Sequence, residues 1–212
     1  MDISAYILVV VISYLLGATP SGYLAGMACG IDVRTAGSGN IGATNVVRVL
    51  GKRVGAIVLA ADALKGFISA RWVPLLALWL FPSPGTSREN LALAGGVAAI
   101  LGHIYTCWLK FKGGKGIATS GGVVLAWAPV ACLTALALWG LVLAASKYVS
   151  LASIAAAIIL PFAVWFGNGH WNGSPTMTYA MAGLSLLAIY KHKANIQRLL
   201  KGQESRIGRK KT

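Results

Sequence analysis

The chain has 212 residues, of which 57% are hydrophobic and only 11% are charged, and its mean hydropathy is +0.70. Soluble globular proteins carry about 25% charged residues, so this composition excludes an ordinary water-soluble domain and indicates a chain surrounded largely by lipid. The formal charge of +14 could suit a nucleic-acid partner. The basic residues, however, stand in short gaps between apolar stretches and near the C-terminus, which is typical of the cytoplasmic loops of a membrane protein.

Seven apolar stretches approach the length of about 20 residues that a helix needs to cross a bilayer. They cover residues 4–27, 54–80, 91–110, 116–128, 129–146, 151–167 and 176–190. We therefore predict an all-α integral membrane protein with seven transmembrane helices, formed by a single domain over residues 1–212 with a basic tail from about residue 201. The fourth stretch is short, because Pro129 follows it at once, and we expect it to tilt or to cross where other helices shield it.

The distribution of charge predicts the orientation of the chain. If all seven stretches span, 16 of the 19 Lys and Arg residues lie on one side, within 28–53 and 110–115, at Lys147, and from Lys191 onward. Cytoplasmic loops carry such an excess of basic residues. We therefore predict that the N-terminus lies outside and the C-terminus lies in the cytoplasm.

The residue types that usually hold metals are sparse. Cys29, Cys107 and Cys132 lie in or beside apolar stretches, and their spacing does not match a zinc site. The polar segments offer no set of carboxylates that could converge on magnesium or calcium. We therefore expect neither a metal nor a cofactor.

Polar residues gather in four segments on the predicted cytoplasmic face, residues 37–48, 110–120, 146–153 and 190–196. The first begins with GSGN, a turn-forming sequence, and continues into a short helical pattern that ends at Gly51. A glycine-rich turn that leads into a helix presents backbone N–H groups to an anion. Thr44 and Arg48 would share a face of this helix, where Arg48 could bind phosphate or contact lipid headgroups.

The other three segments also place polar groups near expected helix ends. Lys115 lies in GGKG (113–116), which opens the fourth stretch and could bind an anion or form a flexible basic turn. Ser150 is the expected N-cap of the sixth helix, and Ser153 either joins a site or bonds its own helix. His192 and Asn195 would share a helix face, so that His192 could bind phosphate or transfer a proton.

The four motifs GSGNIGATNVVR, KFKGGKGIATS, KYVSLAS and HKANI, together with DALKG and GHIYTCWLKF, closely resemble those of the bacterial acyl-phosphate:glycerol-3-phosphate acyltransferase family. The resemblance covers nearly the whole chain. It implies seven spans in the bacterial inner membrane and an active site that faces the cytoplasm. It also implies acyl phosphate and glycerol 3-phosphate as substrates and a membrane lipid, lysophosphatidic acid, as product. Neither acyl-CoA nor nucleic acid is expected as a partner, and the HxxxxD pair of other glycerolipid acyltransferases is absent from the sequence.

The resemblance also implies roles for individual residues. The residues implied to contact glycerol 3-phosphate are Ser38, Arg48, Lys115 and Asn195. Those implied to hold the acyl-phosphate head are Thr44, Gly113, Gly114, Ser153 and His192. The residues implied to shape the first loop around both substrates are Asn40 and Asn45. Catalysis is assigned to the first group together with His192.

Acyl phosphate is already activated, so the expected mechanism needs no covalent nucleophile and depends on positioning and on stabilisation of developing charge. The hydroxyl proton would pass to a substrate phosphate oxygen or to His192. We interpret Asp62, Lys65 and His103 as structural support beneath the site. A transporter would need polar groups near the bilayer midplane, commonly with repeated halves, and neither is evident. A purely structural membrane protein would not need four polar segments of this kind.

Overall fold

The structure is a computed structural model that describes residues 2–166 and 175–207. Its described residues form helices and connecting segments, with no strand among them, which confirms the all-α prediction. They fall into two compact units, divided between Trp127 and Ala128. Because the arrangement of the two units is not determined, each unit is described by itself.

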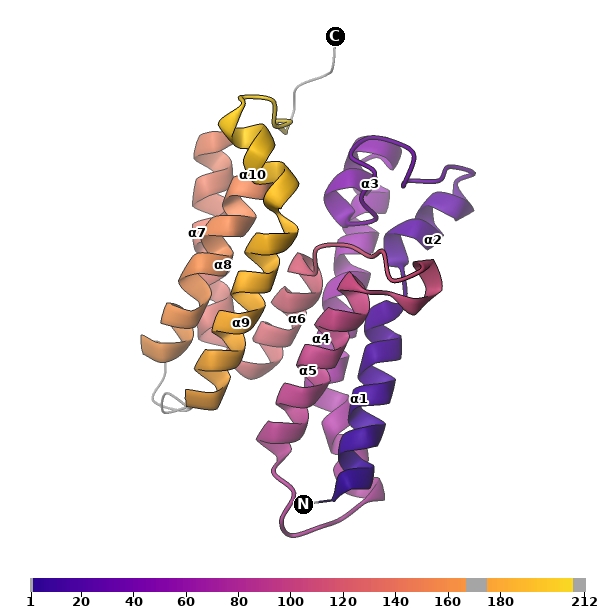
Figure 1. Cartoon of the computed structure of the whole chain (residues 1–212), viewed down its shortest axis with the longest axis vertical. Helices are drawn as coiled ribbons and strands as arrows, with labels where there is room; N and C mark the ends of the chain where they lie inside the picture. The colour runs from indigo at the N-terminus through magenta and orange to yellow at the C-terminus, as the bar shows by residue number, and fades with distance from the viewer. Residues whose placement is uncertain (1, 167–174, 208–212) are drawn as a thin grey trace. The chain divides into compact units, whose positions relative to one another are not determined.

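The first unit contains six α-helices and one short 3₁₀ turn (Figure 1). These are α1 (Ile3–Ala18), α2 (Ser21–Ala28), α3 (Ala43–Leu50), α4 (Lys52–Leu80), α5 (Arg88–Ile104), η1 (Cys107–Leu109) and α6 (Ile117–Trp127). Helices α1, α4 and α5 pack against one another, and α6 packs on α4. Glycines let these helix pairs approach closely, since a Cβ at Gly17 or Gly102 would collide with the partner backbone between α1 and α5.

The second unit contains α7 (Pro129–Ser146), α8 (Val149–Phe166), α9 (Pro175–Lys191) and α10 (Lys193–Leu200). Helix α8 packs against both α7 and α9 (Figure 1), and α10 contacts the ends of α8 and α9. Pro129 opens α7 at a position where its missing N–H costs nothing. Residue 167, the last of the predicted sixth stretch, and residues 208–212 of the predicted tail lie outside the described residues.

Each predicted apolar stretch is mostly helical where the structure describes it; within the stretches, residues 19–20, 105–106, 110, 116 and 128 are not helical. Four helical segments are long and apolar enough to cross a membrane, and they cover Ile3–Ala28, Arg88–Leu109, Pro129–Ser146 and Val149–Phe166. Helix α6 has 11 residues, about 16 Å at 1.5 Å per residue, so it is shorter than a bilayer core of about 30 Å. Its packing on α4 agrees with the expectation that this stretch is shielded by protein. The count of seven spans stays a prediction.

The first predicted stretch, residues 4–27, forms two helices within one candidate span, Ile3–Ala28. The helix stops at Ala18 and a second helix starts at Ser21, because Pro20 has no N–H to continue the backbone ladder. The carbonyl oxygens exposed at this break find other donors. Lys65 Nζ donates to Thr19 O at 2.8 Å, and Thr106 Oγ1 donates to Ala18 O.

Candidate active site

The first polar segment is a loop that two asparagines hold in shape before α3. Asn45 is buried, and its Oδ1 accepts a 2.7 Å hydrogen bond from the backbone N–H of Ser38. Its Nδ2 donates to Val33 O at 2.9 Å and to Ala36 O at 3.1 Å. Asn40 Oδ1 accepts from the N–H of Gly42, the residue before α3, at 2.8 Å. Both asparagines therefore hold this loop in shape, and their predicted role around the substrates stays a prediction.

The same loop leads into α3, which carries the two side chains that could meet an anion. Thr44 lies in the first turn of α3 and is half-buried, and Arg48 lies one turn later and is exposed. The Ser38 side chain is also exposed. Helix α3 ends at Gly51, whose φ of +90° favours glycine, and this confirms the predicted end of the helix. Free backbone N–H groups lie at the start of α3, whereas Arg48 lies in its last turn.

The GGKG loop (113–116) folds back on the end of α5. The N–H of Gly113 donates to Ile104 O and that of Gly114 to His103 O, both at 3.1 Å. Gly116 has a φ of +80°, which turns the chain into the first residue of α6, Ile117. Lys115 is half-buried directly before this helix. The loop thus ends at a helix N-terminus, as the sequence predicts.

The first loop and the GGKG loop belong to the same part of the first unit. Leu109, which closes the turn η1 before the GGKG loop, packs in one hydrophobic cluster with Val33, Ile41 and Val46 of the first loop and α3. Val58 of α4 completes this cluster. The eight predicted site residues of the first unit are therefore carried by two adjoining loops and the helices that follow them.

In the second unit the two predicted serines bond to other elements of that unit. Ser153 is buried on α8, and its Oγ accepts a 3.2 Å hydrogen bond from Trp139 Nε1 of α7. The predicted N-cap role of Ser150 is wrong. Helix α8 begins at Val149, because Lys147 at φ +63° has already turned the chain, and Ser150 Oγ instead donates to Glu204 Oε1 at 2.8 Å.

His192 and Asn195 lie at the junction of α9 and α10, and both are buried. His192 Nδ1 lies 2.7 Å from Ala188 O. Since a carbonyl oxygen can only accept, this contact places a proton on Nδ1. Asn195 Nδ2 donates to Glu204 Oε1 at 2.7 Å.

Glu204 organises this region, although the sequence motifs pass over it. Its carboxylate is 8% exposed and accepts from Ser150, Asn195 and Arg198, the last at 2.7 Å from Nε. Burial alone would raise the pKa of this carboxyl group, but the three hydrogen bonds and the Arg198 charge hold its pKa below the usual value. The segment 201–207, predicted as a mobile tail, is thereby tied to the second unit, and Ile207 N–H also bonds to Lys147 O.

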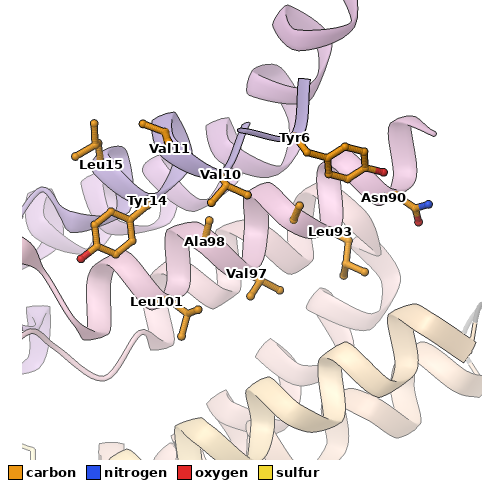
Figure 2. A pocket seen from close by; sticks show the side chains of 11 residues that line it. Tyr6, Val10, Val11, Tyr14, Leu15, Asn90, Leu93, Val97, Ala98 and Leu101 are labelled. Carbon is orange, nitrogen blue, oxygen red and sulfur yellow. The ribbon is translucent and has the colours of Figure 1, made fainter. Parts of the chain in front are cut away.

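An apolar groove of about 870 Å³ lies elsewhere in the first unit, between α1 and α5 (Figure 2). Its polar groups stand at its ends, with Tyr6 near Asn90 at one end and Tyr14 near Leu101 at the other (Figure 2). None of the predicted site residues lines this groove. The polar chemistry of the first unit therefore lies at the two loops, away from this groove.

Comparisons with known proteins agree with the resemblance seen in the motifs. The sequence profile of the family described as "Glycerol-3-phosphate acyltransferase" matches residues 7–202. A relative of that name from Desulforudis audaxviator is 46% identical over 214 residues, which cover 100% of both chains. Two crystal structures of PlsY (YgiH), an integral membrane glycerol 3-phosphate acyltransferase, are each 37% identical to this chain.

The two crystal structures also have a similar fold. The glycerol 3-phosphate form gives a TM-score of 0.84 and the lysophosphatidic acid form a TM-score of 0.82. The first comparison covers 96% of each chain, and the second covers 96% of this chain and 95% of the other. The chain therefore belongs to the glycerol-3-phosphate acyltransferase family, whose members include an integral membrane enzyme.

Proposed function

We propose that this chain transfers a fatty acyl group from acyl phosphate to the sn-1 hydroxyl of glycerol 3-phosphate, giving lysophosphatidic acid and phosphate. The main support is the pair of adjoining loops in the first unit. Each ends at a helix N-terminus, and a cation accompanies each of them: Lys115 lies directly before α6, and Arg48 lies in the last turn of α3. Backbone N–H groups and cations in this arrangement suit a phosphate group. Membership of the family is independent support for the acceptor, glycerol 3-phosphate.

The proposed substrate contacts are those that the motifs imply. In the first unit we propose Ser38, Arg48 and Lys115 for glycerol 3-phosphate. For the acyl-phosphate head, the first unit offers Thr44, Gly113 and Gly114. In the second unit, Asn195 is proposed for glycerol 3-phosphate, and Ser153 and His192 for acyl phosphate. Asn40 and Asn45 act through the shape of the first loop.

The proposed chemistry needs no covalent acyl-enzyme. The acceptor hydroxyl attacks the carbonyl carbon of acyl phosphate, the new ester bond forms, and the bond from that carbon to the phosphate oxygen breaks. Fixed N–H groups and cations stabilise the negative charge that develops on the carbonyl oxygen and the departing phosphate. The hydroxyl proton passes to a phosphate oxygen of the substrate. His192, protonated on both ring nitrogens, donates from Nδ1 to Ala188 O and from Nε2 to the acyl-phosphate head.

We also propose that the chain spans the bacterial inner membrane seven times, with the N-terminus outside and the two loops at the cytoplasmic face. Four apolar segments of sufficient length support the membrane location. The excess of basic residues in the connecting segments supports the orientation.

The proposal is tested by supplying purified protein in proteoliposomes with radiolabelled glycerol 3-phosphate and one acyl donor at a time. Acyl phosphate should give labelled lysophosphatidic acid, and acyl-CoA should give none. Arg48→Ala protein that elutes as wild type in gel filtration is the matched control for contaminating activity. Product formed from acyl-CoA alone would refute the proposed donor.

A further inference from the structure

A network of buried polar side chains lies in the first unit outside the predicted site. Asp62 and Lys65 are buried on α4, and Lys65 Nζ lies 2.8 Å from Asp62 Oδ1. Ser21 Oγ of α2 donates to the same carboxylate oxygen at 3.0 Å. His103 is buried on α5, and its Nδ1 lies 3.6 Å from that oxygen, beyond hydrogen-bond distance and without another hydrogen-bond partner among the described residues. Charged groups inside a membrane bundle are costly and usually serve a function, so a purely space-filling role is a poor explanation of four polar side chains here.

One side of the network is anchored at the break between α1 and α2. Lys65 Nζ donates to Thr19 O at 2.8 Å. This oxygen follows the C-terminus of α1, where carbonyl groups lack helical partners and the helix dipole attracts a cation. Lys65 therefore compensates two negative centres at once, the end of α1 and the Asp62 carboxylate.

The other side of the network touches the GGKG loop. The carbonyl oxygen of His103 accepts from the N–H of Gly114, and a Cβ at Gly114 would collide with the His103 imidazole. The carbonyl oxygen of Ile104 accepts from Gly113 in the same way. The imidazole thus lies against the loop with Nδ1 turned toward Asp62. The orientation of this ring and the path of the loop backbone are coupled.

We infer that Asp62, Lys65 and His103 are positioning residues that hold the GGKG loop in the conformation that binds substrate phosphate. Asp62 orients the imidazole, and Lys65 neutralises Asp62 and ties it to the end of α1. The ring and the carbonyl oxygen of His103 fix the path of the loop backbone. This inference rests on the proposed function, since it gives the loop a substrate phosphate to bind. None of the three residues touches substrate.

The test compares two variants of similar polarity at His103. In His103→Asn the side-chain amide can donate toward Asp62 from the position of Nδ1, whereas in His103→Gln the amide lies at the position of Nε2. Because a displaced loop weakens ground-state and transition-state binding together, KM for glycerol 3-phosphate should rise about 10-fold in His103→Gln and at most about 3-fold in His103→Asn, with kcat little changed. Equal KM values for the two variants would overturn the inference.

The control is Ser69→Ala. Ser69 is buried on α4, one turn from Lys65, and its hydroxyl has no hydrogen-bond partner among the residues that the structure describes. Loss of the Ser69 hydroxyl should leave KM for glycerol 3-phosphate unchanged. A rise in KM equal to that of His103→Gln would show that any buried change in α4 or α5 has the same effect, and this would overturn the inference.

A second measurement needs no variant and no acyl donor. If the loop is held in place before substrate binds, the amide hydrogens of Gly113 and Gly114 should exchange slowly in substrate-free wild-type protein. Rapid exchange at both would overturn the inference. If acyl phosphate is not the donor, wild-type protein will instead show no turnover with acyl phosphate. KM for glycerol 3-phosphate is then measured with the donor that the wild-type protein does use, so the two failures are distinguishable.

Discussion

Replacing Glu204 by Ala should destabilise the second unit by several kcal/mol. The carboxylate accepts hydrogen bonds from Ser150, Asn195 and Arg198 and is itself buried. Removing it takes away the acceptor of two buried hydrogen bonds, at about 1–3 kcal/mol each. The Arg198 side chain is 41% exposed, so its ion pair adds only about 0–1 kcal/mol. The expected loss is about 2–7 kcal/mol, a range that includes the typical cost of removing one partner from a buried charged pair.

The assay is thermal unfolding of the purified protein in detergent. Glu204→Ala should lower the midpoint by several degrees, and Glu204→Gln, which keeps one acceptor oxygen but no charge, should lower it less. The exposed neighbour Gln203→Ala is the control and should unfold as wild type. Unchanged midpoints for both Glu204 variants would refute the reasoning that this carboxylate holds the C-terminal segment in place.

The same carboxylate predicts a dependence of stability on pH. Its pKa is lower in the folded protein than in the unfolded chain. The stabilisation is therefore fully present above the unfolded pKa, about 4.3 for Glu, and is lost as the pH falls through the lower, folded pKa. The difference in midpoint between wild type and Glu204→Ala should shrink in that acid range and stay constant above it.

Three further outcomes are expected from the proposed function and orientation. Arg48→Ala should lower kcat/KM by at least about 100-fold through the loss of charged hydrogen bonds. Arg48→Lys should also have a low kcat/KM, because the guanidinium fork is lost. Near-full activity of folded Arg48→Ala protein would place the pocket elsewhere. His192→Gln should keep part of the activity. It should also keep the acid limb of the pH–rate profile, because the substrate phosphate, with a pKa of about 6, sets that limb. Loss of the acid limb in this variant would show that His192 is the general base. The orientation is tested in protein whose three native cysteines are replaced. Gly85→Cys should react with an impermeant thiol reagent added outside, and Gln203→Cys should react only after the membrane is opened. The reverse pattern would contradict the orientation.

Local patterns in the sequence predicted the elements that depend on neighbouring residues. The end of α3 at Gly51 could be predicted because the positive φ at this position favours glycine. The Asp62–Lys65 pair is present because residues three apart share a helix face. The break after Ala18 was missed, although Pro20 signals it, because the hydropathy of the two short helices together resembles one span. The single-domain prediction remains untested.

The remaining features depend on contacts between distant parts of the chain. Glu204 lies 54 residues from Ser150, and no local spacing predicts that they bond. An isolated carboxylate in an otherwise basic C-terminal segment is the one available signal, since only five acidic residues occur in the whole sequence. In the same way, the bond from Lys65 to Thr19 could not be predicted without the helix break.

The central claim, direct transfer from acyl phosphate to glycerol 3-phosphate, is tested most directly by following both products in one reaction. Purified protein is mixed with acyl phosphate, with or without glycerol 3-phosphate, and released phosphate and lysophosphatidic acid are measured over time. The account predicts that the two products form in equal amounts and that neither forms without the acceptor. A burst of phosphate in the absence of glycerol 3-phosphate, with acyl label retained on the protein, would contradict it.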